Sequence, residues 1–343
     1  MKKIISILLV LVMALGVLAL ASCSKPEDDA SQTTAATTEA EGGAEALKFG
    51  LGVYTSATAT DATADKAGEG KATVTVAAVL LDKDGKIVKA AIDCADSAVN
   101  YTADGKASKP GEFKTKYEQG ADYGMVAYGG AAKEWFEQAD AFCSVLVGKT
   151  ADDLAGLVAA DYKGTEDVVN AGCTIYVSEF VKAVDAAIKA AKDSAATKDA
   201  ALKLGISTSA TPTDATAEKA GSSKVETTVY AAAVDADGKV IAATADCVEV
   251  EFTFDTAGKS TFDAKKVVLS KRQQGADYGM VAYAGSAKEW FEQADAFAAA
   301  TVGKKASEFA SLMGEDYKGN SDLQAAGCTI YVSGFVKAAS KIG

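Results

Sequence analysis

The chain contains an internal duplication, and this feature constrains its fold more than any other. Three segments occur twice, letter for letter: QGADYGMVAY at 119–128 and 274–283, KEWFEQADAF at 133–142 and 288–297, and AGCTIYVS at 171–178 and 326–333. Because a duplicated segment usually folds as a unit, the 343 residues should form two copies of one domain of modest size. A site that serves both copies must be built from residues that both copies keep.

Composition and charge exclude several classes of function. The chain is 49% hydrophobic and 24% charged, as soluble globular proteins are. Its net charge of −12 disfavours nucleic acid and anionic membrane surfaces as partners, because both require clustered Lys and Arg. The absence of histidine excludes Ser-His triads and His-ligated zinc or haem. The one arginine, Arg272, has no arginine counterpart in the first copy, so no duplicated Arg clamp for a phosphate exists.

The N-terminus predicts export. Lys2 and Lys3 precede an apolar run from Ile4 to Leu20, and two small residues then lead to Cys23. A basic start, an apolar centre and small residues before the cut are typical of a signal peptide. The cysteine resembles that of a bacterial lipobox, which implies cleavage before Cys23 and diacylglycerol on its sulfur. A retained membrane helix is the alternative. We expect an extracytoplasmic protein that is lipid-anchored to the cell membrane.

The expected domain boundaries follow from composition. Apart from one proline, residues 24–45 hold no apolar residue larger than alanine, so they cannot bury enough surface to fold. The prediction is a signal peptide at 1–22, a disordered tether at 23–47, a first repeat at 48–194, a linker at 195–203 and a second repeat at 204–343.

The first half of each repeat predicts antiparallel strands. Apolar residues at 74–80 and 87–92 flank Asp82-Lys83-Asp84-Gly85-Lys86, and Asp-Gly between two such runs favours a hairpin. The second copy has the same turn at 235–239. A calcium loop is the alternative for Asp-x-Asp-Gly, but the downstream ligands and the closing Glu are missing. A third β-rich run follows at 97–102, with its counterpart at 248–254.

The second half of each repeat predicts helices. One face of a helix from residue 133 carries the apolar side chains Trp135, Phe136, Ala139, Phe142, Cys143 and Leu146. The opposite face, with Glu134, Glu137 and Asp140, is expected in solvent. Thr150 and Ser178 are candidate caps of two later helices, and residues 173–177 are expected to form a strand between them. The fold class is therefore α+β: two tandem copies of a small domain with a mainly antiparallel sheet packed by helices.

The repeated Ala-Gly-Cys-Thr segment is the strongest candidate site. Gly172 and Gly327 allow a close approach of the backbone, and Thr174 and Thr329 offer hydroxyl groups. A helix N-terminus nearby would favour an anion. The alternative is that the segment only leads the chain into the last helix.

The order of these features resembles the FMN-binding domain family of exported electron-transfer flavoproteins and of flavin-carrying subunits of respiratory complexes. The shared features are the early hairpin with Asp84-Gly85-Lys86-Ile87, a central Gly-containing segment, a Phe-rich helix, and a late Gly-x-Thr-Ile before a helix. The resemblance implies FMN as cofactor, attached by a dedicated transferase through a phosphoester to Thr174 and Thr329.

The chain departs from the family's late motif. Alanine stands at 171 and 326 in place of Ser or Thr, cysteine stands at 173 and 328 in place of Ala, and Asp167 and Asp322 lie one residue further upstream. Covalent flavin, non-covalent flavin and a fold without flavin all stay open.

Two further groups of residues are candidates for cofactor contact or for structure. Tyr123, Met125, Tyr278 and Met280 lie in the central segment that contacts flavin in the family, although Tyr and Met in loops more often serve ordinary packing. Trp135 and its copy lie on the apolar stripe of the helix and are expected in the core.

The cysteines leave two interpretations open. In an exported protein, Cys94 with Cys173 and Cys247 with Cys328 could form one disulfide in each repeat. Buried free thiols, acting as small apolar side chains, are the alternative. No spacing suggests a redox pair, and no metal site is predicted.

Two functions remain in view. The first is a membrane-anchored lipoprotein with tandem FMN-binding-like domains for extracellular electron transfer from a membrane donor, in which the cofactor carries the redox chemistry. The second is a ligand-binding or structural surface lipoprotein without flavin. No catalytic residue is assigned, because the sequence shows no nucleophile–base pair for a hydrolase.

Overall fold

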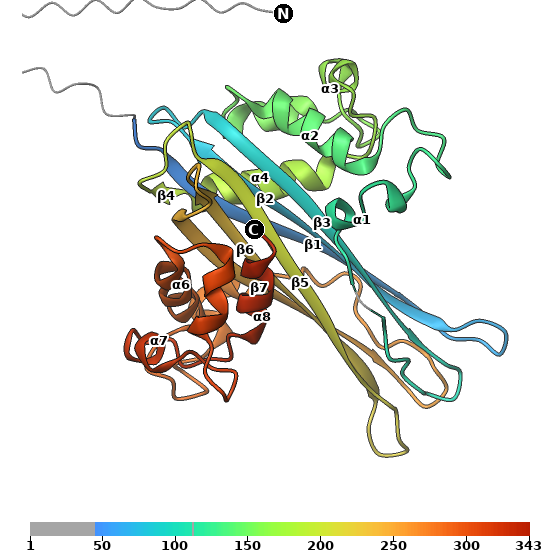
Figure 1. Cartoon of the computed structure of the whole chain (residues 1–343). Coiled ribbons are helices and arrows are strands. Elements are labelled where there is room, and N and C mark those ends of the chain that lie inside the picture. The colour runs from blue at the N-terminus through green and yellow to red at the C-terminus, as the bar shows by residue number, and fades with distance from the viewer. Residues whose placement is uncertain (1–44, 112) are drawn as a thin grey trace, which may run out of the picture. The chain divides into compact units, whose positions relative to one another are not determined.

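The computed structural model describes residues 45–111 and 113–343, and these belong to one compact unit. Two antiparallel sheets are packed by helices, which confirms the predicted α+β class (Figure 1). The predicted signal peptide, Cys23 and nearly all of the tether lie outside the described residues. Within the described residues, no helix has both the length and the apolar character needed to cross a membrane.

The two repeats share one order of elements, except that β4 of the first has no counterpart in the second. The first repeat contains β1 (Lys48–Thr60), β2 (Gly68–Leu81), β3 (Ile87–Tyr101), α1 (Lys116–Gln119), η1 (Gly120–Tyr123), α2 (Trp135–Leu146), η2 (Ala151–Leu157), α3 (Glu166–Ala171), α4 (Ser178–Ala190) and β4 (Lys192–Asp193). The second contains β5 (Ala201–Thr213), β6 (Gly221–Val234), β7 (Val240–Phe254), α5 (Lys271–Gln274), η3 (Gly275–Tyr278), α6 (Trp290–Thr301), η4 (Ala306–Leu312), α7 (Ser321–Ala325) and α8 (Ser333–Ser340).

Every strand pairing is antiparallel, with the order β3-β2-β1-β4 in one sheet and β5-β6-β7 in the other. The predicted turn between β2 and β3 is confirmed. The Asp82 carboxylate accepts hydrogen bonds from the backbone N–H groups of Asp84 and Lys86 at 2.9 and 2.8 Å. Asp235 does the same in the second repeat. These aspartates therefore stabilise a tight turn.

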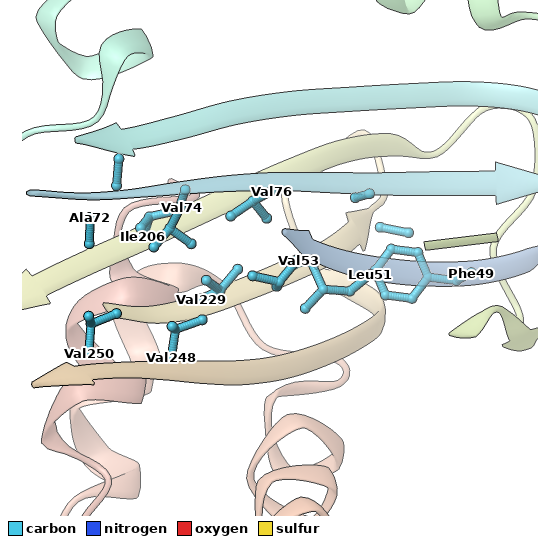
Figure 2. Close-up of a cluster of buried hydrophobic side chains, with 14 of the residues drawn as sticks. Phe49, Leu51, Val53, Ala72, Val74, Val76, Ile206, Val229, Val248 and Val250 are labelled. Atoms are coloured by element: carbon cyan, nitrogen blue, oxygen red, sulfur yellow. The ribbon is translucent and has the colours of Figure 1, made fainter. Parts of the chain in front are cut away.

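Residues 74–81 of strand β2 are buried on both faces, because their alternating side chains enter two different cores. Val74, Val76 and Leu80 face the other sheet, whereas Val79 and Leu81 face the helices. The core between the sheets is built from both repeats, as Figure 2 shows for Phe49, Leu51, Val53, Ala72, Val74, Val76, Ile206, Val229, Val248 and Val250. The two repeats thus share one hydrophobic core.

The helices of each repeat cover the other face of its sheet. Helices α2 and α4 pack on the first sheet, and α6 and α8 pack on the second. Helix α4 comes so close to β1 that a β-carbon at Gly52 would lie 2.1 Å from the Ala183 carbonyl oxygen. Glycine is required there because only a bare backbone admits the helix.

Three predicted boundaries differ from the structure. The runs predicted at 87–92 and 97–102 belong to one continuous strand, β3, because the residues between them keep their pairing with β2. Strand β5 begins at Ala201, inside the predicted linker 195–203, because it pairs with β6 from its first residue. Ser178 is the first residue of α4 rather than its cap, which is Val177.

Candidate functional site

The Ala-Gly-Cys-Thr segment ends α3 and leads into a connection to α4, and the strand predicted at 173–177 is absent. Gly172 caps α3 with a left-handed φ of 105°, which ends the helix. An isolated bridge between Lys163 and Tyr176 is the β-pairing of this segment. Thr174 is exposed, and so is Thr329 in the second repeat. Both predicted attachment residues are therefore accessible from solvent.

A buried glutamine orients the threonine. The Gln138 side-chain oxygen accepts hydrogen bonds from the Thr174 backbone N–H at 2.9 Å and from its hydroxyl at 3.0 Å. Gln293 and Thr329 repeat this arrangement at 2.9 and 3.1 Å. The hydroxyl oxygen keeps its own lone pairs for a ligand. Sequence reasoning missed this role, although the glutamine lies in a block that both copies keep.

A lysine lies against the glycine of the same segment. A β-carbon at Gly172 would come within 2.2 Å of the Lys133 ammonium nitrogen. In the second repeat the Lys288 ammonium lies equally close to Gly327, at 2.3 Å, and donates a hydrogen bond to the Ala326 carbonyl oxygen at 3.0 Å. Glycine is needed for its positive φ, and a β-carbon there would displace the flexible end of the lysine. Each repeat thus places a positive charge beside the threonine segment, and this was not predicted.

The first repeat has a cavity of about 670 Å³ beside Thr174. Tyr123 and Met125 of the central segment line it, together with Trp135 of α2 and Lys116 of α1. The structure therefore brings together three residues that the sequence singled out separately: Thr174, Tyr123 and Met125. The predicted core position of Trp135 is confirmed, with 4% of its surface exposed, although the ring also lines the cavity.

The central segment is held by a carboxylate that was expected in solvent. Glu134 is 8% exposed, and its oxygens accept the backbone N–H groups of Met125 and Val126 at 2.9 and 3.3 Å. Glu289 holds the second copy of the segment in the same way. The predicted solvated position of Glu134 was wrong, because the carboxylate satisfies backbone donors of a loop that helical periodicity does not reveal.

Lys116 lies at the base of the cavity. Its ammonium is 5.3 Å from the centre of the Tyr123 ring and 5.5 Å from that of Trp135, and 3.4 Å from the Asp96 carboxylate. Burial lowers the pKa of Lys116, but its neighbours Cys94, Asp96 and Tyr123 more than offset this effect and raise it above the ordinary value. The group is therefore a fixed cation at neutral pH and not a base.

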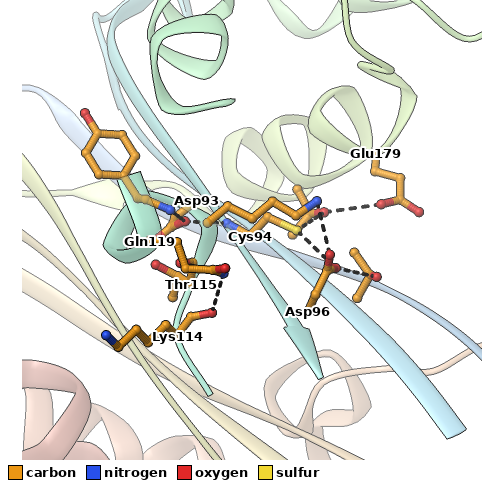
Figure 3. A network of polar contacts seen from close by, with 11 residues as sticks. Asp93, Cys94, Asp96, Lys114, Thr115, Gln119 and Glu179 are labelled. Carbon is orange, nitrogen blue, oxygen red and sulfur yellow. Dashed lines mark hydrogen bonds and ion pairs between the residues drawn. The ribbon is translucent and has the colours of Figure 1, made fainter. Parts of the chain in front are cut away.

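The walls of the cavity contain further polar contacts. The Thr73 hydroxyl donates to Asp96 at 2.7 Å, and the Thr75 hydroxyl lies 3.4 Å from Glu179 and 3.9 Å from the Cys94 sulfur. Figure 3 shows Cys94, Asp96 and Glu179 in this network. The cavity therefore combines aromatic surface with charges of both signs.

A buried aspartate positions the helix that carries Lys116. Asp93 accepts the backbone N–H groups of Cys94 and Tyr117 at 2.7 and 3.2 Å and is hydrogen-bonded to the Thr115 side chain (Figure 3). Burial raises the pKa of Asp93 to about 6. Thr115 and Tyr117 flank Lys116, so this carboxyl group sets the direction of the lysine.

The five cysteines in the described residues are free and buried. The pairs proposed as disulfides, Cys94 with Cys173 and Cys247 with Cys328, are therefore unpaired thiols in the structure. Burial raises the pKa of Cys94 to about 12 and that of Cys173 to about 11. A buried, protonated thiol behaves as a small apolar side chain.

The second repeat keeps the lysine, the cysteine and the tryptophan of the cavity but not its volume. Its equivalent cavity measures about 60 Å³ and is lined by Lys271 and Trp290, while Tyr278, Met280 and Thr329 do not line it. Tyr278 and Met280 pack against the core of the second repeat, as Tyr123 and Met125 do against that of the first. No family model, curated protein or solved structure matches the chain.

Proposed function

We propose that the protein is an extracytoplasmic lipoprotein, anchored to the cell membrane through Cys23, that binds FMN in its first repeat and carries electrons. One observation supports this proposal most directly. The exposed Thr174 hydroxyl borders a cavity of about 670 Å³ that is lined by Tyr123, Met125 and Trp135. Sites for cofactors and other small molecules typically measure about 300–1,000 Å³ and are lined by aromatic side chains with a few polar groups.

The residues present fit the two ends of the cofactor. At the phosphate end, Lys133 supplies a positive charge beside Gly172, and Thr174 supplies a hydroxyl oriented by Gln138. At the other end, the rings of Tyr123 and Trp135 offer flat apolar surface for an isoalloxazine ring. The chain has neither histidine nor a duplicated arginine, so a lysine and a hydroxyl are the natural partners for a phosphate.

The protein's own residues would bind FMN, orient its ring and tune its reduction potential. When bound, FMN supplies the redox chemistry by accepting and releasing electrons. The Lys116 ammonium would favour negative charge on a ring beside it, which raises the reduction potential. Electron transfer of this kind requires no protein base, in agreement with the raised pKa of Lys116 and the buried thiols.

The proposed partners are a membrane electron donor, reached through the lipid anchor, and a flavin transferase. The transferase would pass the FMN phosphoryl group from a flavin dinucleotide to the exposed Thr174 oxygen; the phosphoanhydride bond of the donor breaks, a nucleoside monophosphate leaves, and the threonine hydroxyl loses its proton. Covalent attachment would explain why an outward-facing hydroxyl is held in one direction by a buried glutamine.

Visible absorption tests the proposal. Protein coexpressed with a flavin transferase should absorb as flavins do, and its flavin fluorescence should persist after denaturation if the bond is covalent. Thr174→Ala should abolish the covalent flavin of the first repeat. Loss of flavin from Thr329→Ala but not from Thr174→Ala would contradict the assignment to the first repeat.

A second candidate is a lipoprotein that binds a ligand other than flavin. The carboxylates of Asp96 and Glu179 line the same cavity as Lys116, and a zwitterionic or cationic small molecule would use them. A colourless protein that also fails to bind added FMN would favour this candidate or a purely structural role.

A further inference from the structure

We infer that the two repeats are functionally unequal: the first holds an open ligand cavity, and the second is a closed copy whose own side chains fill the equivalent space. The identity of the ligand as FMN rests on the proposed function, but the inequality itself rests on the structure.

The base of the cavity is the same in both repeats. Lys271 stands for Lys116, and its ammonium lies 5.2 and 5.5 Å from the ring centres of Tyr278 and Trp290. A buried cysteine, Cys247, lines the small cavity as its counterpart lines the large one. The inequality therefore does not come from loss of these residues.

The volumes of the two cavities differ by an order of magnitude, about 670 against about 60 Å³. A water molecule takes a share of about 30 Å³ in the liquid. The cavity of the second repeat therefore has room for water but not for a cofactor ring, whereas that of the first has room for both.

One cross-strand pair accounts for much of the closure. In the first repeat Thr73 of β2 lies opposite Asp96 of β3, and in the second repeat Glu226 of β6 lies opposite Glu249 of β7. Both positions thus carry a longer, acidic side chain in the second repeat, and these side chains extend into the space above Lys271.

The two glutamates fix the lysine. The Lys271 ammonium lies 2.9 Å from Glu249 and 3.9 Å from Glu226, and Lys224 adds a contact of 2.7 Å to Glu249. In the first repeat the lysine makes one ion pair, at 3.4 Å with a shorter carboxylate. The charges of the second repeat are therefore satisfied within the protein and not left for a ligand.

The last helix carries a different residue against the sheet in the second repeat. Glu179 of α4 corresponds to Gly334 of α8, where a β-carbon would lie 2.7 Å from the Thr228 hydroxyl oxygen. The first repeat accommodates a complete glutamate side chain at this position, with its carboxylate 3.4 Å from the Thr75 hydroxyl. The second repeat therefore has no room for a side chain at this position of α8, whereas the first has room for a glutamate.

The part of the site around the threonine hydroxyl is nevertheless the same in the second repeat. Thr329 is exposed and oriented by Gln293, and Lys288 lies against Gly327. A flavin joined to Thr329 would have its phosphate held but its ring in solvent. The expected result is one sequestered flavin per chain.

The chain offers an internal probe for each cavity, because Trp135 lines one and Trp290 the other. Both rings have the same exposed fraction, 4%. In the full chain, Trp290→Phe leaves Trp135 as the only tryptophan, and Trp135→Phe leaves Trp290. Acrylamide should quench Trp135 several-fold more strongly than Trp290, because it can enter the larger cavity. Equal quenching would overturn the inference, whether or not FMN binds.

Flavin stoichiometry completes the test. Titration of the full chain with FMN should saturate at one equivalent and quench the tryptophan of the first repeat, and two equivalents sequestered alike would overturn the inference. Replacing Glu226→Thr and Glu249→Asp together should open the second cavity, with increased quenching of Trp290 and a second equivalent of FMN. Absence of FMN binding with unequal acrylamide quenching would refute the proposed function and support the inequality.

Discussion

Gln138 and Thr174 lie 36 residues apart in the chain, and one glutamine oxygen accepts hydrogen bonds from both the backbone N–H and the hydroxyl of the threonine. The glutamine is 1% exposed, and its amide nitrogen donates to the Lys133 carbonyl oxygen at 3.0 Å. This contact ties the bend before α4 to the start of α2 and fixes the direction of the hydroxyl.

Replacing Gln138 should therefore lower both the free energy of unfolding and the yield of covalent flavin. Gln138→Ala leaves a backbone donor without its partner, which destabilises the protein by about 1–3 kcal/mol, and it frees the Thr174 hydroxyl to rotate. Urea unfolding and the yield of covalent flavin measure the two effects. Gln293→Ala is the matched control in the second repeat, with a similar loss of stability and no loss of sequestered flavin. Equal flavin yields from both variants would contradict the role of Gln138.

Gly172 should tolerate alanine poorly, for two separable reasons. The left-handed φ of 105° strains any other residue, and the new β-carbon would displace the Lys133 ammonium. We expect a loss of about 1–3 kcal/mol from the backbone strain alone. Gly85→Ala is the control for backbone strain, because Gly85 has a φ of 77° and no atom within 4 Å of its would-be β-carbon. Gly172→Ala should weaken FMN binding, whereas Gly85→Ala should leave it unchanged.

The buried Asp93 should make stability fall as the pH rises. Its pKa is about 6 in the folded protein against 3.8 ordinarily, so between these values the native state binds a proton that the unfolded chain has lost. The stabilisation is complete below pH 3.8 and is lost as the pH rises through 6, and the difference amounts to about 3 kcal/mol.

Asp93→Asn should remove this contribution, because a neutral amide oxygen can still accept the two backbone hydrogen bonds. Unfolding free energies on either side of the window, in wild type and variant, give the slope. Burial also raises the pKa of Asp246. The variant should therefore retain the part of the pH dependence of stability that comes from Asp246. An unchanged slope in Asp93→Asn would show that this carboxyl group is ionised throughout.

The shared core predicts that damage in one repeat is felt in the other. Phe252 of β7 is fully buried, and its ring occupies the space that a β-carbon on Gly70 of β2 would need. Phe252→Ala should destabilise the protein by about 3–5 kcal/mol. In a Trp290→Phe background, fluorescence of Trp135 should report this loss from the first repeat in a single transition. Unchanged unfolding of the first repeat would mean that the repeats unfold independently.

The buried thiols predict a simple pattern of reactivity. Burial holds the pKa of Cys94 and Cys143 near 12, so few thiolates exist at neutral pH and access to them is blocked. A thiol reagent should react slowly with the native protein, and after unfolding without reductant it should react with all five cysteines of the described part of the chain. Mass mapping would identify them. If only one of these cysteines reacted and the other four were joined in pairs, the two predicted disulfides would be supported instead.

Local patterns in the sequence were sufficient for the repeat, the hairpin and the amphipathic helix. The duplication predicts two like units, Asp-Gly predicts the turn at Asp82, and the apolar stripe predicts α2, because each of these depends on neighbours close in the chain. Strands β1 and β5 are missing from the prediction. Their exposed halves are rich in Thr, Ser and Ala, and only pairing with β2 and β6 identifies them as strands.

The sequence by itself determined that two copies of one α+β unit exist and that Thr174 and Thr329 are the hydroxyls to examine. Only the tertiary structure decided which side chains meet them. Gln138 contacts Thr174 and Lys133 lies against Gly172, whereas Glu134 holds the central segment. The spacing of these residues in the sequence does not predict these contacts. It also decided that two nearly identical segments border unequal cavities, because the volume depends on facing side chains such as Glu226 and Glu249 on separate strands.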